Sequence, residues 1–224
     1  MVEKATDSLK NGKFILVHDD KNREDEVDMV IPAQYITPQH ISKMRNDAGG
    51  LICLAISNEI AESLGITYMH DLLRYHPDSI FLKLTEGYSK YGDKPSFSIS
   101  INHRETYTGI TDFDRSLTIS KMSEICNEIN NNGKINFKEN FMTPGHVNLL
   151  ISSKNLLSDR IGHTELSIQL ASIAKLTPAM VICEMLDSIS YRALTLEQAK
   201  KYAEKNSLVI VDSSEVLKYL NYKK

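Results

Sequence analysis

Hydrophobic residues recur along the chain in short apolar runs and in longer stretches with a helical period. The apolar runs predict strands at 14–17, 29–31, 51–56, 96–101, 147–151, 178–186 and 207–211. Helical spacing with start and stop signals predicts helices at 3–11, 38–49, 58–65, 116–130, 166–174, 195–206 and 213–221, with a turn at 130–133. The first two strands follow each other closely, which indicates an early β-hairpin.

The alternation of strands with helices, together with the hairpin, is typical of a mixed α/β domain. The chain shows no internal repeat and no linker rich in proline, glycine or serine. We therefore expect a single domain over residues 1–224. Residues 66–95 depart from this pattern, because they follow no clean period and their last part, 87–95, resembles an exposed loop.

Composition narrows the classes of function. The chain is 42% hydrophobic and 25% charged, as in ordinary globular proteins, and its formal net charge of -3 gives no broad basic surface for nucleic acid. No apolar run approaches membrane-spanning length, and the N-terminus lacks a signal core, so we expect no membrane partner. Three cysteines occur without CxxC spacing, and Cys53 and Cys183 lie in apolar runs. Core thiols indicate a reducing compartment, and we expect a cytoplasmic protein.

The loop between the first two strands is rich in acids. Residues 19–28 contain six carboxylates together with Arg23. A solvated surface is the common role of such a charge run. Here, however, the run lies between two apolar strands, and its closely spaced acids repel one another unless a cation is bound. Oxygen-rich acidic clusters suit Mg²⁺, so the loop is a candidate magnesium site.

The segment before the helix predicted at 166–174 combines an anion site with a histidine. Thr164 can cap this helix. The positive helix end, Arg160 and the permissive backbone at Gly162 together favour phosphate binding. His163 lies beside this site and can ligate a metal or transfer protons. The alternative is a solvated Arg160 and an ordinary loop histidine.

Three further polar residues are candidates for chemistry. Thr108 belongs to a hydroxyl-rich turn before the helix at 116–130, where a purely structural role is the alternative. His146 follows Pro-Gly, so we expect an exposed histidine on a tight turn. Glu184 is the one carboxylate of an apolar strand, where an ionised side chain is costly unless it is paired or lies near a metal. It is therefore a candidate acid or base.

Taken together, these segments resemble the 3,4-dihydroxy-2-butanone 4-phosphate synthase family, riboflavin-pathway enzymes that act on ribulose 5-phosphate. The matching motifs occur in the family's order at 19–28, 108–109 with 114–115, 144–147, 160–165 and 181–184. Val27 and Ile161 stand where relatives often carry glycine. The resemblance implies an α+β fold, a mixed-sheet α/β sandwich.

The resemblance also implies a reaction and its requirements. The enzyme would be a lyase that converts D-ribulose 5-phosphate to L-3,4-dihydroxy-2-butanone 4-phosphate and formate. It would use two Mg²⁺ ions per site, with Mn²⁺ as an alternative, and would form a homodimer with active sites at the subunit interface. The chain leaves no room for the GTP cyclohydrolase II domain fused in some bacteria, so we expect the monofunctional form.

Individual residues take roles by the same resemblance. The metal ligands would be Glu24 and His163, and the catalytic residues His146, Glu184, Glu26 and Asp28. The substrate would contact Arg23, Glu24, Asp28, Thr108, Arg160, Gly162, His163, Thr164 and Glu184. Within that set, Arg160, Gly162 and Thr164 would hold the phosphate. His146 would serve the partner's site, and the acidic loop would close over the sugar.

Two other functions fit the same residues. A metal-dependent phosphosugar isomerase or aldolase would use the same anchor and metals but release no formate. A non-catalytic nucleotide- or phosphate-binding module would keep its ligand after chelation and after loss of Glu24.

Overall fold

The structure is a computed structural model that describes residues 1–75, 80–87, 89–90, 92–131 and 136–221. Part of the predicted turn at 130–133 lies outside these ranges. The helices are α1 Val2–Lys10, α2 Pro38–Lys43, α3 Asn58–Leu64, α4 Met69–Arg74, α5 Ile80–Leu84, α6 Asp112–Asn130, α7 Phe137–Asn140, α8 His163–Ile173, α9 Leu196–Asn206 and α10 Ser213–Tyr219. The strands are β1 Ile15–His18, β2 Val27–Pro32, β3 Cys53–Ile56, β4 Phe97–His103, β5 Phe141–Ile151, β6 Ala179–Glu184, β7 Leu186–Asp187, β8 Arg192–Ala193 and β9 Val209–Asp212.

Seven strands form one mixed sheet in the order β4-β5-β3-β6-β2-β1-β9. The pairs β1/β2, β2/β6, β3/β6 and β4/β5 are antiparallel, whereas β1/β9 and β3/β5 are parallel. β7 and β8 form a separate small hairpin. The predicted hairpin and the mixed α/β sheet are confirmed.

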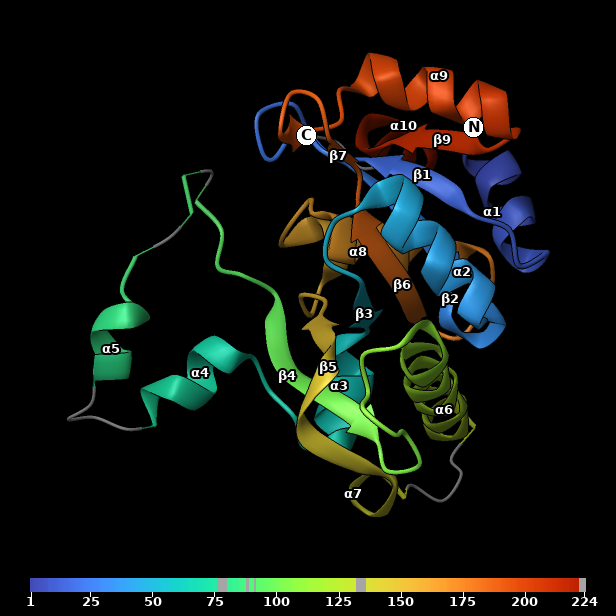
Figure 1. Cartoon of the computed structure of the whole chain (residues 1–224). Coiled ribbons are helices and arrows are strands. Elements are labelled where there is room, and N and C mark those ends of the chain that lie inside the picture. The colour runs from blue at the N-terminus through green and yellow to red at the C-terminus, as the bar shows by residue number, and fades with distance from the viewer. Residues whose placement is uncertain (76–79, 88, 91, 132–135, 222–224) are drawn as a thin grey trace.

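Alternate residues of the central strands enter two different cores, one on each face of the sheet. In β3, Leu54 and Ile56 belong to one core and Cys53 and Ala55 to the other. Helices α2, α3, α6 and α9 contribute to the first core, and α1, α8 and α10 to the second. This three-layer arrangement (Figure 1) confirms the predicted sandwich and explains why the central strands are apolar on both faces. Cys53 and Cys183 are buried free thiols, as expected.

Side-chain caps fix several helix starts where the sequence predicts them. Thr37 and Ser57 accept backbone N–H groups at the starts of α2 and α3, and Thr195 forms a capping box with Gln198. Helix α6 begins at Asp112, four residues before the predicted start, because the Thr111 hydroxyl accepts the N–H of Asp114 at 3.0 Å.

Residues 66–95, here called the arm, contain the short helices α4 and α5, which no sequence period predicted. Figure 1 shows this segment projecting from the body beside β4. Among the described residues, no helix is both long and apolar enough to cross a membrane.

Strand β5 begins at Phe141 rather than after the Pro-Gly-His segment, so the predicted tight turn at His146 is wrong. Ile101 pairs with Val147, but the next residue, Asn102, pairs with Met142, which leaves 143–146 as a bulge within the strand. The predicted exposure of His146 is confirmed. A Cβ atom added to Gly145 would lie 2.0 Å from the carbonyl carbon of Ile101, so only glycine fits this close approach.

We expect Gly145→Ala to reduce the free energy of unfolding by about 3 kcal/mol, because the methyl group meets backbone atoms that cannot move without breaking the β4–β5 ladder. Gly65→Ala is the control. Gly65 has a φ of +68° and open space around it, so this substitution should cost only about 1 kcal/mol. Urea unfolding of both variants measures the difference, and equal losses would contradict this account of Gly145.

Candidate active site

The acidic loop between β1 and β2 is organised around the buried carboxylate of Asp19. Its Oδ1 accepts the N–H of Glu26 at 3.1 Å, and its Oδ2 accepts the N–H of Glu24 at 3.2 Å. The same Oδ2 lies 3.0 Å from Nη1 of Arg23. Because a buried carboxylate requires such donors, Asp19 holds the loop backbone in one arrangement.

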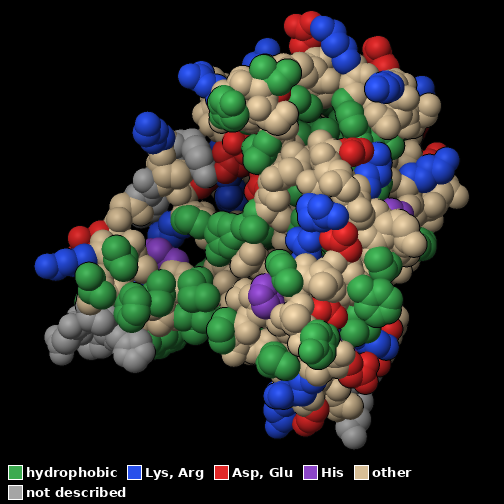
Figure 2. All heavy atoms as spheres, in the orientation of Figure 1, with side chains coloured by type: hydrophobic (Ala, Val, Ile, Leu, Met, Phe, Trp, Pro, Cys, Tyr) green, Lys and Arg blue, Asp and Glu red, His purple; other side chains and the backbone are tan. Residues whose placement is uncertain are grey.

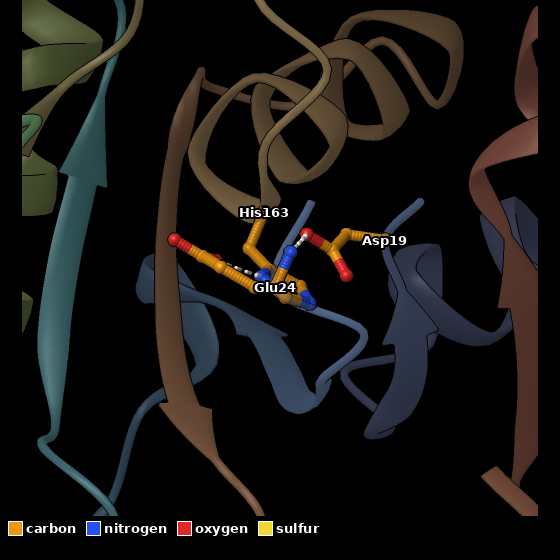
Figure 3. A group of neighbouring side chains, drawn as sticks. All are labelled: Asp19, Glu24 and His163. Atoms are coloured by element: carbon orange, nitrogen blue, oxygen red, sulfur yellow. Dashed lines mark hydrogen bonds and ion pairs between the residues drawn. The ribbon is translucent and has the colours of Figure 1, made fainter. Parts of the chain in front are cut away.

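Glu24 and His163, 139 residues apart in the chain, meet in this arrangement. The Oε2 atom of Glu24 lies 3.3 Å from Nδ1 of His163 and 2.7 Å from Nη1 of Arg23. Figure 3 shows Glu24 and His163 pointing toward each other, with Asp19 beside them. One ligand atom from each of Asp19, Glu24 and His163 lies within 4.8 Å of the others, and such a group could hold a metal ion. The acidic loop and the start of α8 thus converge, as predicted.

The second ring nitrogen of His163 faces further oxygens of the same loop. Its Nε2 lies 3.2 Å from the carbonyl oxygen of Glu26 and 3.7 Å from Oδ1 of Asp28. Burial lowers the pKa of His163, but the carboxylates of Asp28 and Glu24, with that of Asp19, outweigh burial and raise it to about 9. The histidine therefore sits in a strongly negative environment.

Asp28 and Glu184 lie side by side where β2 pairs with β6. Burial, followed by repulsion from Glu184, Glu26 and Glu24, raises the pKa of Asp28 to about 7 even though His163 opposes the shift. Burial and the nearby Glu24 also raise the pKa of Glu26. The Glu184 carboxylate accepts the N–H of Leu51 at 2.7 Å, which fixes its orientation. The structure thus brings the predicted carboxylates of Glu24 and Asp28 to His163, with those of Glu26 and Glu184 near Asp28.

The start of α8 differs from the sequence prediction in detail. The N-cap is Gly162 rather than Thr164, which is the second residue of the helix and is buried. The φ of Gly162 is -110°, an ordinary value, so backbone freedom is not its contribution. A Cβ atom there would lie 3.0 Å from guanidinium atoms of both Arg160 and Arg23. Glycine instead leaves room for two cationic side chains at the helix start.

Both of these arginines contact a carboxylate that the sequence analysis did not identify. Oδ2 of Asp93 lies 2.7 Å from Nε of Arg23 and 3.3 Å from Nε of Arg160. Arg160 also contacts Oε2 of Glu165 at 2.8 Å and Oγ of Ser96 at 2.5 Å. No local pattern marks Asp93, because its partners are 70 and 67 residues away. The predicted anion position therefore holds a carboxylate of the protein itself.

A second group missed from the sequence fixes the outer side of the acidic loop. His18 is buried, and its ring bridges Oδ2 of Asp212 at 2.7 Å and Oδ1 of Asp25 at 3.0 Å. Asp25 has a φ of +53°, an unusual value for a residue other than glycine, and lies between Glu24 and Glu26. His18 therefore ties the loop to the last strand of the sheet.

Thr108 and His146 lie apart from these groups. The backbone and hydroxyl groups of Thr108 donate to Asp114, and the hydrogen bonds of His146 in the described structure go to Asn102. His146 is on β5, which β3 and β6 separate from β2. The described residues of one chain thus assemble the acidic cluster and the arginines, whereas the hydrogen bonds given for Thr108 and His146 lie elsewhere.

Comparisons with known proteins agree with this fold. The family model described as 3,4-dihydroxy-2-butanone 4-phosphate synthase matches residues 3–219. A protein of that name from Archaeoglobus fulgidus is 40% identical over 220 residues, which cover 97% of this chain and 92% of the relative. The crystal structure of the synthase of Candida albicans is 28% identical with a TM-score of 0.77, and the match covers 98% of this chain and 96% of that one. A synthase crystallised in complex with two magnesium ions is 22% identical with a TM-score of 0.76, covering 98% and 95% of the two chains. The chain belongs to the 3,4-dihydroxy-2-butanone 4-phosphate synthase family.

Proposed function

We propose that this chain, as one domain over residues 1–224, converts D-ribulose 5-phosphate to L-3,4-dihydroxy-2-butanone 4-phosphate and formate, a step of riboflavin biosynthesis. The observation that supports the proposal most directly is the contact of Glu24 with His163, with Asp19 in the same group. This contact joins the two sequence segments that the reaction would need, the acidic loop and the anion-binding helix start.

The residues around His163 fit a divalent cation. Oδ1 of Asp28 is buried and has no hydrogen-bond partner among the described residues. Several carboxylates lie close together there. A bound cation would offset their mutual repulsion and would interact with the Asp28 oxygen that lacks a hydrogen-bond partner. We propose Glu24 and His163 as ligands of two Mg²⁺ ions, or Mn²⁺ as an alternative, because oxygen donors dominate the group. The two ions in the 22% identical synthase suggest the number.

The remaining site residues would bind the substrate or transfer protons. Arg160, Gly162 and Thr164 at the start of α8 would hold the phosphate, so that the carbonyl end of the sugar lies toward the acidic loop. Arg23, Asp28 and Thr108 would contact the sugar hydroxyls. Glu26, Asp28, Glu184 and His146 would move the protons.

The arrangement of these groups suits a reaction with several proton transfers. The Leu51 N–H orients the carboxylate of Glu184, and Asp28 faces it across the strand pair. Two carboxyl groups at one position can accept and return a proton in successive steps. The metal pair would supply Lewis-acid stabilisation of the negative charge that develops on the sugar oxygens.

We propose that the site is completed by a second copy of the chain. Within one protomer, Thr108 and His146 form hydrogen bonds away from the acidic cluster. Figure 2 shows hydrophobic side chains gathered on the arm, and Tyr75, Ile80 and Leu84 are each more than two-thirds exposed. An exposed apolar surface of this kind is typical of an interface, and a homodimer would place His146 at the partner's site.

Incubation of the protein with ribulose 5-phosphate and Mg²⁺ should produce formate and a four-carbon sugar phosphate in a 1:1 ratio. NMR spectroscopy detects both products. EDTA should stop the reaction, and added Mg²⁺ should restore it. Interconversion of pentose phosphates without formate would identify an isomerase or aldolase instead. Phosphate binding without turnover, unaffected by EDTA, would identify a binding module.

Glu24→Ala and His163→Ala should each reduce kcat at least about 1000-fold, because each removes a proposed metal ligand. Both should weaken Mn²⁺ binding measured by electron paramagnetic resonance while circular dichroism stays unchanged. Thr164→Ala should mainly raise KM, since it would remove one contact to the phosphate. Normal Mn²⁺ affinity in Glu24→Ala would refute the metal assignment.

Mixing inactive variants tests whether His146 acts across the dimer. Glu24→Ala and His146→Ala, unfolded together and refolded in equal amounts, should recover about a quarter of wild-type activity, because half of the dimers are mixed and each holds one intact site. The control mixture of Glu24→Ala with His163→Ala should stay inactive, since both residues belong to the same protomer's site. Equal recovery in the two mixtures, or none in either, would contradict the shared site.

A further inference from the structure

Two guanidinium groups converge over Gly162 at the start of α8. A Cβ atom there would touch Nη1 of Arg160 and Nη2 of Arg23, each at 3.0 Å. Helix α8 has 11 residues, and its first N–H groups point toward the same end. Two arginines and a helix N-terminus together form a strongly anion-attracting position.

Four carboxylates contact these two arginines. Arg23 contacts Asp19 at 3.0 Å and Glu24 at 2.7 Å, and Arg160 contacts Glu165 at 2.8 Å. Asp93 contacts both arginines. A single oxygen of Asp93, Oδ2, faces the two guanidinium groups. One oxygen between two guanidinium groups is the arrangement that a phosphate oxygen would also adopt.

Asp93 differs from Asp19 and Glu165 in how readily an anion can displace it. The side chains of Asp19 and Glu165 are fully buried, and each also accepts backbone N–H groups, from the acidic loop and from Ser153 respectively. The side chain of Asp93 is 28% exposed and lines a cavity of about 330 Å³ that also exposes Arg160. Figure 2 shows the surface hollowed between the arm and the body. An anion that enters this cavity can therefore displace Asp93 but not the fully buried side chains of Asp19 and Glu165.

We propose that Asp93 is an internal competitor for the substrate's phosphate group, occupying its position between Arg23 and Arg160 and leaving when the phosphate binds. This inference rests on the proposed phosphate role of Arg160. After Asp93 leaves, Arg23 keeps Asp19 and Arg160 keeps Glu165, so both guanidinium groups stay in place.

Such a competitor has a chemical reason in this reaction. Substrate and product carry the same phosphate, so contacts to it stabilise both equally and cannot lower the barrier between them. A carboxylate of the protein that returns to the arginines weakens the binding of both substrate and product. Asp93 would therefore raise KM and speed product release, at no cost to the chemical step.

Removing the charge of Asp93 tests the inference without altering the size of the side chain. In calorimetric titration of the Mg²⁺-loaded protein with inorganic phosphate, Asp93→Asn should lower Kd about tenfold, because the charged group that competes for the two arginines is gone. Asp71→Asn is the matched control. Asp71 lines the same cavity but contacts His70, so its variant should stay within about twofold of wild type.

Two further measurements separate competition from a structural role. Asp93→Asn should lower KM for ribulose 5-phosphate about tenfold without raising kcat, and Asp93→Glu, which keeps the carboxylate, should restore weak phosphate binding. Unchanged or weaker phosphate binding in Asp93→Asn would overturn the inference. Arg160→Met tests the phosphate role of Arg160, on which the role of Asp93 rests. Wild-type phosphate binding in that variant would overturn both roles. Absence of formate production with tighter binding in Asp93→Asn would refute the reaction alone.

Discussion

The buried carboxylate of Asp19 is the interaction on which the site depends. It accepts N–H groups from Glu24 and Glu26 and contacts Arg23, so one side chain fixes three residues of the loop. A carboxylate without water is tolerated only with such donors, and the loop has no regular secondary structure to satisfy its own backbone. The same bonds that satisfy Asp19 therefore determine where Glu24 points, and hence its contact with His163.

The acidic loop and the strand ends beside it carry more negative than positive charge. The pKa values of Asp28 and Glu26 are raised because burial and mutual repulsion disfavour their ionised forms. A fold gains no stability from crowding acids in this way, which is why such groups are commonly found at functional sites. The two-metal proposal accounts for the crowding, because cations would convert a destabilising group of acids into a binding site.

Hydrophobic periodicity predicted the seven strands of the large sheet, most helices and the mixed architecture, because burial on both faces of the sheet leaves a clear pattern. It did not predict the short β7–β8 hairpin. The acidic loop and the start of α8 were also recognisable, since their polar residues are close in sequence. His146 was misplaced because the bulge in β5 depends on the close approach of Gly145 to β4, a tertiary contact. The arm and Asp93 were missed for the same reason. Asp93 acquires its position only through arginines that are far away in the chain.

The bridge from His18 to Asp212 has a consequence for how the protein is made. Strand β1 pairs in parallel with β9, and His18 lies opposite Asp212 in that register. Asp212 follows His18 by 194 residues, so the loop that carries Glu24 is synthesised well before the strand that supports it. Contacts of such long sequence separation form late and slowly. The nascent chain must therefore extend through β9 before the β1–β2 hairpin gains this support.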